Sequence, residues 1–434
     1  MSDVVAAGLV AGVWLAVVAI ALASSLVIER RMRLGRRLER PELAPPRAVW
    51  GGGIEHPPSR YAPARVLALL ARMVRTRTRI VGLARPLRVY GHVVACTALA
   101  GGLALVPFGG RYGATQDGVP LVALDLAHGL VALAFVQLLA AASTIAVGLG
   151  DRSAWSRFGS VRIASRSLAS TGLLLIVLAP IALEAGSLRL HDIVETQQAG
   201  FTPLGWLAAE SGLAADVLRW IHESGRLPAW NVFAQPLTAV LFVVTAALVI
   251  RRPLAWDPAT GHVALAGLGL DADPIDEYWA RVESRLARLL AAALFVSLFL
   301  GAGAIPFVES RTLIDRLAPY FGTGLPSLLV LGLEAVVFLA KVLATLALLA
   351  LVRRATAVLR DDQWIRLVTR RLIPLAWANL LLMGAILLVS TELSESARAT
   401  QAEAAESSAH PAADASPQSE PESATAAAGT GGAS

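Results

Sequence analysis

The chain has 434 residues, of which 56% are hydrophobic and only 16% are charged. Its mean hydropathy of +0.61 lies far above that of soluble domains, which excludes an ordinary soluble enzyme and indicates an integral membrane protein. The formal net charge of +6 does not indicate a nucleic-acid-binding surface, because the basic residues flank apolar stretches and anionic lipid headgroups account for them.

Eight apolar stretches have the length of a membrane-spanning helix. Helices are expected because backbone groups in lipid must be satisfied within the segment. The predicted fold is an all-α integral membrane protein with eight transmembrane helices, amphipathic interfacial helices and a disordered C-terminal tail. The predicted spans are residues 4–28, 89–108, 121–148, 168–188, 232–250, 286–308, 326–352 and 372–391.

The segments between the spans carry weaker signals. In residues 64–80 apolar side chains alternate with arginines, which predicts an amphipathic helix at the membrane face. Residues 208–222 are also helix-like. Residues 393–434 consist mainly of Ala, Ser, Glu and Pro without apolar periodicity, which predicts a disordered tail. The membrane domain is therefore predicted to cover residues 1–392.

The arginines predict the orientation of the chain. Residues 29–88, 149–167, 251–290 and 352–373 hold 30 of the 37 arginines. By the positive-inside rule these connections face the cytoplasm, and both termini face outward.

Lys341 is the only lysine, and it lies inside an apolar run whose only other charge is Glu334. An ionisable group inside a span is costly and marks a candidate functional site. Unlike arginine, a lysine can lose its proton when desolvated, so Lys341 is a candidate proton carrier. The alternative is that Lys341 pairs with Glu334, two turns earlier, or extends along a cavity. If it carries a proton, Lys341→Met should abolish coupled activity and leave assembly intact.

No cofactor site is predicted in this chain. One cysteine, Cys96, is too few for an iron–sulfur cluster, and the seven histidines lack metal-ligand spacing. The glycine-rich stretches match neither a dinucleotide fingerprint nor a P-loop. Any electrons must therefore come from another subunit.

The order of residues from Lys341 to Asn379 resembles, without a gap, the end of the H subunit of bacterial respiratory complex I, which is subunit 1 in mitochondria. That family has a lysine in its seventh span, then an arginine-rich loop ending in Asp-Gln and a Pro-Leu-x-x-x-Asn entry into the last helix. Five other stretches are similar to the family in the same order: Glu29-Arg30-Arg31 with Gly35-Arg36, Gly159–Arg162, Gly186-Ser187-Leu188 with Asp192, Trp230–Leu237, and Phe299-Leu300-Gly301.

The chain departs from that family at two glutamates. Counting from Arg162 places Thr171 where the family has one, and Leu248 stands where it has the other. Neither Thr nor Leu can carry a proton across a bilayer. Asp125 and His128, three residues apart on the third predicted span, are candidate substitutes that would share a helix face.

The resemblance implies a non-redox subunit of a proton-translocating NADH:quinone oxidoreductase in the bacterial inner membrane. Such a subunit anchors the hydrophilic arm and helps to form the quinone chamber. The implied partners are the other complex I subunits, quinone as substrate, and lipid. The implied chamber and arm-interface residues are Arg30, Arg31, Arg36, Arg162, Arg353, Arg360, Asp362 and Gln363; the proton-path candidates are Lys341, Glu334, Asp125, His128 and Glu184.

Two alternatives remain open. The chain could be the homologous membrane subunit of an energy-converting hydrogenase, for which loss of the quinone-side acids would be suitable. It could also be a non-enzymatic membrane scaffold or small-solute transporter of the same fold. A neighbouring large subunit with paired CxxC motifs would favour the hydrogenase, and stable expression without redox subunits would favour the scaffold.

Overall fold

The computed structural model of the chain describes residues 3–39, 84–112, 119–150, 154–198, 200–201, 227–249, 274–305, 310–322, 324–355 and 361–409. Contacts divide the chain into two units, Met1–Leu381 and Leu382–Ser434. Each of the eight predicted spans falls on a helix. These helices are α1 (Asp3–Glu39), α3 (Ala84–Ala104), α4 (Gly129–Leu149), α5 (Ala154–Ala185), α9 (Pro236–Val249), α10 (Pro274–Phe299), α12 (Gly324–Ala355) and α14 (Ile373–Ala409).

Shorter elements connect the long helices. Two antiparallel strand pairs form, in which Arg111 is opposite Pro120 and Gly200 is opposite Pro228. The short elements are β1 (Arg111–Tyr112), β2 (Val119–Pro120), α6 (Leu190–Gln198), β3 (Gly200–Phe201), β4 (Leu227–Pro228), α8 (Asn231–Ala234), α11 (Ser310–Phe321), α13 (Asp361–Leu367) and the π-helix η3 (Val368–Leu372).

Length and composition confirm an all-α membrane protein. Within the described residues, five helices are long and apolar enough to cross a membrane, and two more apolar helices are shorter, at Tyr90–Ala104 and Pro236–Ala247. The sixth predicted span falls on α10, whose first half carries charged residues. The number of eight crossings stays a prediction. The five long apolar segments are Ala6–Ser24, Gly129–Leu149, Ser156–Ala185, Gly324–Val352 and Gln363–Glu392.

Several predicted boundaries were wrong. The third span was predicted from residue 121, but α4 begins at Gly129 because β2 and a series of turns precede it. The sixth was predicted to reach residue 308, but α10 ends at Phe299. Residues 393–409 were predicted to be disordered, yet α14 continues to Ala409, and their Ala- and Glu-rich composition favours a helix. The predicted helices at 64–80 and 208–222 lie outside the described residues.

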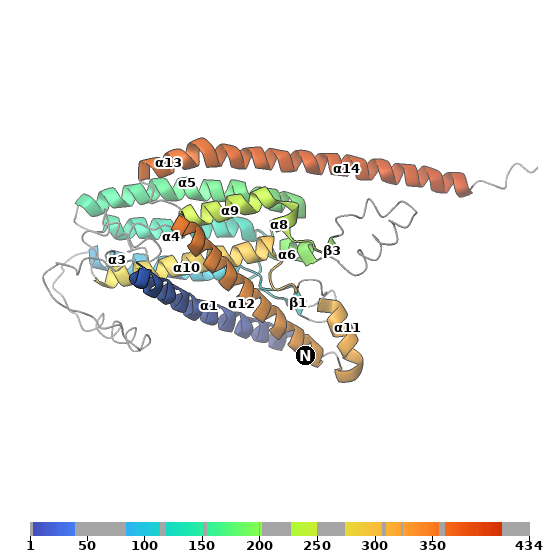
Figure 1. Cartoon of the computed structure of the whole chain (residues 1–434), viewed down its shortest axis with the longest axis horizontal. Coiled ribbons are helices and arrows are strands. Elements are labelled where there is room, and N and C mark those ends of the chain that lie inside the picture. Colours follow the sequence, from blue (N-terminus) through green and yellow to red (C-terminus); the bar gives the residue numbers. More distant parts are fainter. Residues whose placement is uncertain are drawn as a thin grey trace, which may run out of the picture. The chain divides into compact units, whose positions relative to one another are not determined.

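Helix α10 lies at the centre of the first unit. It packs against α3, α9, α12 and α1, and Figure 1 shows it between α5 and α9 on one side and α1 and α12 on the other. Residues 289–299 of α10 are all buried. Phe295 and Phe299 lie with their ring centroids 5.9 and 5.5 Å from that of Phe242 on α9. A helix that is apolar on every side is typical of the core of a bundle.

Consecutive long helices of this unit run in alternating directions. The C-terminal ends of α1, α4, α9 and α12 therefore gather with the N-terminal ends of α3, α5 and α10, on the left of Figure 1.

Candidate functional site

The predicted arm-interface residues lie at that same end of the unit. Arg30, Arg31 and Arg36 belong to the last third of α1, Arg353 to the last turn of α12, and Asp362 and Gln363 to α13. Arg162 is exposed near the start of α5, and Gln363 is exposed too. Because α1 packs on α12 and α13 packs on α5, the fold gathers residues from distant parts of the sequence. Arg360 lies outside the described residues.

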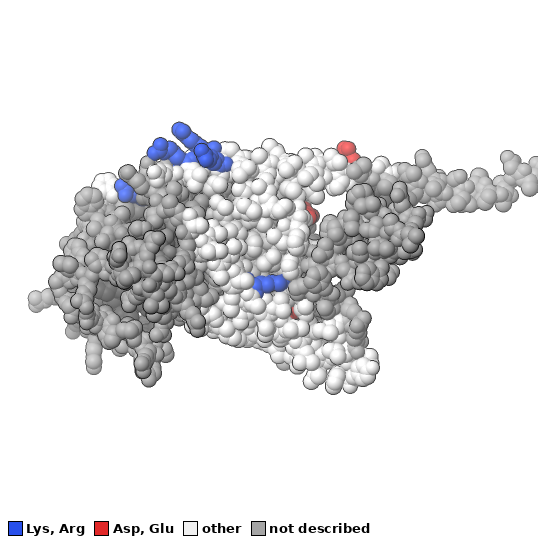
Figure 2. Space-filling model, viewed as in Figure 1, with Lys and Arg blue, Asp and Glu red and all other residues white. Residues whose placement is uncertain are grey.

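Three exposed arginines extend this basic end: Arg366, Arg370 and Arg371, on α13 and η3. In Figure 2 the Lys and Arg atoms gather over these two elements. Trp364 is buried under the cluster, and the guanidinium of Arg166 on α5 lies 4.9 Å from its ring centroid. This cation–π contact fixes α13 against α5. The sequence prediction missed Arg366 and Arg371, although their position in a positive loop was a usable signal.

Lys341 binds the end of a helix. Its Nζ donates hydrogen bonds to the carbonyls of Leu300, Ala302 and Ala304, at 2.7, 2.9 and 2.8 Å. It also lies 4.4 Å from the ring centroid of Trp230. An ammonium group has three N–H donors, so these carbonyls use all of them. The cation therefore caps the C-terminal end of α10, where the helix dipole places negative charge.

The turn that Lys341 holds is strongly bent. Gly301 and Ala302 have φ angles of 64° and 51°, so the chain leaves α10 through two left-handed residues. The side-chain carbonyl of Gln197 accepts a hydrogen bond from the N–H of Gly301 at 3.0 Å, and its amide donates to the carbonyl of Ser297 at 3.0 Å. Asn231 donates to the carbonyl of Leu298 at 2.8 Å. Residues from α6, α8 and α12 thus satisfy the backbone where α10 ends.

Glu334 lies two turns before Lys341 on α12 and is 3% exposed. Two glycines make room for it: a Cβ added to Gly109 would lie 2.3 Å from its Oε2, and one added to Gly303 would lie 2.6 Å from its backbone oxygen. This carboxylate, buried against the segment between α3 and β1, remains a candidate proton carrier.

Asp125 and His128 do not share a helix face, and this prediction was wrong. Both precede α4, with His128 at its N-cap. The carboxylate of Asp125 accepts hydrogen bonds from Arg189, with Nε and Nη2 at 3.1 and 3.0 Å. His128 is exposed. This ion pair links the segment before α4 to the segment before α6.

Glu184 begins a chain of side-chain hydrogen bonds that leads inward. Its carboxylate accepts from the amide of Gln235. Thr238 donates to the carbonyl of Gln235 at 3.1 Å, and Asn379 donates to Thr238 at 2.8 Å. Glu184 is exposed, whereas Gln235, Thr238 and Asn379 are buried. Thr171, where the sequence resemblance predicts a glutamate, is 6% exposed, and its hydroxyl carries no charge.

One buried pair was absent from the sequence prediction. His92 Nδ1 lies 2.7 Å from Glu283 Oε1, and the side chains are 1% and 0% exposed. The residues are 191 positions apart, and Glu283 lies in the predicted cytoplasmic connection 251–290. Only the fold shows that they meet.

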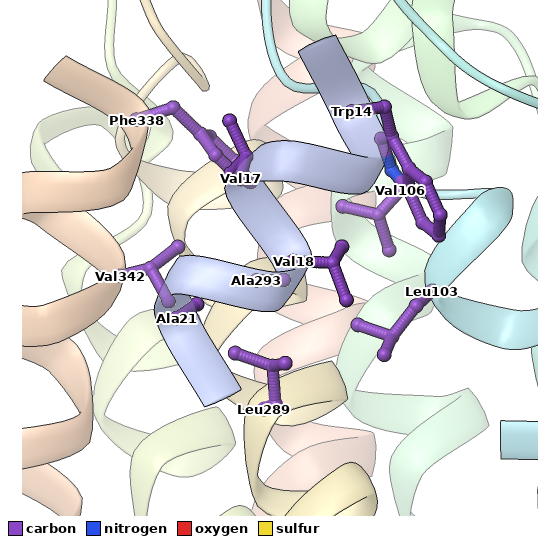
Figure 3. Close-up of a pocket in the computed structure, with 10 residues that line it drawn as sticks. All are labelled: Trp14, Val17, Val18, Ala21, Leu103, Val106, Leu289, Ala293, Phe338 and Val342. Carbon is purple, nitrogen blue, oxygen red and sulfur yellow. The ribbon is translucent and has the colours of Figure 1, made fainter. Parts of the chain in front are cut away.

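A small apolar cavity of about 20 Å³ opens between α1, α3, α10 and α12 (Figure 3). Its size suits one methyl group or one water molecule and excludes a quinone ring. Its lining residues are Trp14, Val17, Val18, Ala21, Leu103, Val106, Leu289, Ala293, Phe338 and Val342.

His191 on α6 is buried, and among the described residues neither of its ring nitrogens has a hydrogen-bond partner. Burial lowers the pKa of His191 below its usual range, and Arg111 lowers this pKa further. The nearby carboxylates of Glu195, Asp125 and Asp192 raise the pKa and oppose these effects only in part. Native His191 is therefore neutral where an unfolded chain would begin to bind a proton.

This pKa predicts a loss of stability in acid. Below about pH 6.5 the histidine of the unfolded chain binds a proton, whereas native His191 stays neutral. The free energy of unfolding therefore falls as the pH falls, by at most about 1.4 kcal/mol per pH unit. Thermal unfolding of the full chain in detergent, at several pH values, measures this dependence. His191→Leu should show a shallower dependence, and equal slopes for both proteins would contradict the prediction.

Comparison with known proteins identifies the family of the chain. A family model described as NADH dehydrogenase matches residues 66–384. The second H subunit of the NADH-quinone oxidoreductase of Rhodopseudomonas palustris is 27% identical over 335 residues, which cover 76% of this chain and 85% of that protein. The H subunit of the same enzyme from Bdellovibrio bacteriovorus is 25% identical over 276 residues, 62% of this chain and 66% of the relative.

The match to another relative is shorter. The second H subunit of the NADH-quinone oxidoreductase of Cereibacter sphaeroides is 28% identical over 219 residues, so the alignment spans 50% of this chain and 60% of the length of that protein. The family model nevertheless covers most of the sequence, including α3 to α13 and the start of α14. The chain belongs to the NADH dehydrogenase family, which is the family of the complex I membrane protein known as the H subunit in bacteria.

Proposed function

We propose that this chain is a membrane-arm subunit of a proton-translocating NADH:quinone oxidoreductase, where it anchors the hydrophilic arm and helps to form the quinone chamber. The observation that carries the proposal is the family match over residues 66–384, on a bundle whose basic residues gather at one end. The relatives are named as subunits of NADH-quinone oxidoreductase.

The proposed orientation follows from that basic end. The exposed side chains of Arg366, Arg370 and Arg371 would face the cytoplasm of a bacterial cell, together with the end of α1. Eight crossings would then put both termini on the outer face of the inner membrane. The alternating directions of the long helices support this arrangement (Figure 1).

The proposed role is non-redox. One cysteine in the whole sequence cannot hold an iron–sulfur cluster, so the electrons would reach quinone from a partner protein. This chain would line part of the quinone chamber and place charged side chains near it. With Thr and Leu at two glutamate positions, proton movement would depend on other buried groups, of which Glu334 is one.

The test is a mild-detergent pull-down of the tagged chain, with mass spectrometry and an inhibitor-sensitive NADH:quinone reductase assay on the eluate. Recovery of iron–sulfur and NADH-oxidising subunits with activity supports the proposal. Recovery of a large subunit with paired CxxC motifs instead would identify a hydrogenase-type partner, and recovery of the chain alone would identify a scaffold or transporter. Either result overturns the proposal.

The basic end gives a sharper prediction. Replacing Arg366, Arg370 and Arg371 by Gln should reduce recovery of hydrophilic-arm subunits at least about tenfold, because each charge-assisted contact with a partner contributes about 1.5–3 kcal/mol. The control is Arg189→Gln, which removes a half-exposed arginine beside α6. Equal recovery for both variants would show that this end is not the docking surface.

A further inference from the structure

The buried pair of His92 and Glu283 joins two helices inside the membrane domain. His92 lies near the start of α3, and Glu283 lies in the first half of α10. The imidazole Nδ1 and the carboxylate Oε1 are 2.7 Å apart. At that distance one hydrogen lies between the two groups, and both side chains are withdrawn from solvent.

The surroundings of the pair are small and closely packed. A Cβ added to Gly91 would lie 2.9 Å from the backbone oxygen of Ser143, so α3 and α4 approach closely beside His92. The hydroxyl of Thr144 on α4 lies 3.5 Å from Glu283 Oε2, and its shorter hydrogen bond goes to the carbonyl of Ala140 at 2.9 Å. The second carboxylate oxygen of Glu283 therefore lies near a hydroxyl whose shorter hydrogen bond goes to the backbone of α4.

Other ionisable residues lie on the helices that carry this pair, whereas some of the neighbouring helices have none. Helices α4 and α9 contain no ionisable residue along their whole length. Helix α3 also carries Arg85, Arg88, Tyr90 and Cys96, and α10 also carries Asp276, Glu277, Tyr278, Arg281, Arg285 and Arg288. Helix α1, which packs on α10, carries Glu29, Arg30, Arg31, Arg33, Arg36, Arg37 and Glu39 near its C-terminal end. Helix α12 carries Glu334 and Lys341 and, near its end, Arg353 and Arg354.

Stability alone does not account for such a pair. Two buried titratable groups cost desolvation free energy, and replacing both by apolar side chains is often neutral or stabilising. Two buried ionisable side chains that pair with each other are therefore candidates for a functional role.

We propose that His92 and Glu283 form a proton-binding site that takes up and releases one proton as a unit. In the deprotonated form, neutral imidazole donates its Nδ1–H to the carboxylate. Proton uptake gives either imidazolium with carboxylate or imidazole with carboxylic acid, and no other bond changes. Its place on a proton path rests on the proposed function, but proton binding itself does not.

The test counts protons on the full chain in lipid nanodiscs. Between about pH 5 and about pH 9 the wild type should take up one more proton than the double variant His92→Leu/Glu283→Met, which removes both charges and is expected to fold. Infrared spectroscopy over the same range should show a carboxyl or imidazole change that the double variant lacks. Glu195→Gln, at a partly exposed carboxylate on α6, is the matched control and should retain the His92–Glu283 signal.

Each result decides the proposal. Equal proton uptake by wild type and double variant would make the pair a structural pin between α3 and α10. If the double variant fails to fold, the single variant His92→Gln assigns the imidazole signal in a histidine ¹⁵N spectrum, and a signal that stays unchanged with pH overturns the site. Because the titration needs no partner protein, a failed pull-down together with a positive titration would reject the proposed function and leave the site standing.

Discussion

Replacing Lys341 by methionine is expected to destabilise the membrane domain by about 1.5–3 kcal/mol, the usual contribution of hydrogen bonds to a charged group. The side chains have similar volume, so packing changes little. The carbonyls of Leu300, Ala302 and Ala304 would lose the ammonium that binds all three. In a bilayer core no water replaces it. Only the hydrogen bonds of Gln197 and Asn231 described above would then stabilise the end of α10 and its left-handed turn.

This expectation differs from that of a pure proton carrier, whose loss would abolish coupled activity and leave the fold intact. The measurement is thermal unfolding of the full chain in detergent, paired with the quinone reductase assay in the assembled complex. The control is Val336→Met, at a side chain on the same helix that is 63% exposed, with an expected change within about 0.5 kcal/mol. If Lys341→Met unfolds like the control, the capping role is wrong.

Hydropathy predicted the helices well but not where two of them meet a turn. Residues 121–124 are apolar and extend the third span in a sequence window, yet they follow β2 and precede α4. Polarity alone cannot separate an apolar turn from an apolar helix, because the difference lies in the backbone hydrogen bonds. The same limit moved Asp125 and His128 onto a helix they do not belong to. After Phe299 a signal did exist, since Gly301 and Gly303 favour an end to the helix.

The candidate site was predictable in part. The isolation of Lys341 among arginines marked it for attention, and the structure gives it partners that no spacing rule contains, since they are backbone carbonyls of another helix. The His92–Glu283 pair left no local signal, because its members are 191 positions apart and each is ordinary in its own segment. Pairs of this kind depend on helix packing, which one sequence does not specify.

Gly303→Ala is expected to be the second severe variant. A Cβ at residue 303 would lie 2.5 Å from the carbonyl oxygen of Phe108 and 2.6 Å from that of Glu334. Both atoms belong to the backbone, so neither can rotate away, and the turn after α10 would have to move away from Phe108 and from α12. Overpacking of this kind typically costs about 1–3 kcal/mol, and two backbone clashes place this variant at about 3 kcal/mol or more.

The chain offers a matched control for Gly303→Ala. Gly332 lies on α12 with nothing within 4 Å of an added Cβ, so Gly332→Ala should be neutral or stabilising by up to about 1 kcal/mol. Similar thermal unfolding midpoints for the two variants would contradict the close approach at Gly303. Because Gly303 and Lys341 secure the same turn, the double variant should lose less stability than the sum of the single variants. Additive losses would mean that the turn is held independently from its two sides, and that Lys341 acts on something other than the end of α10.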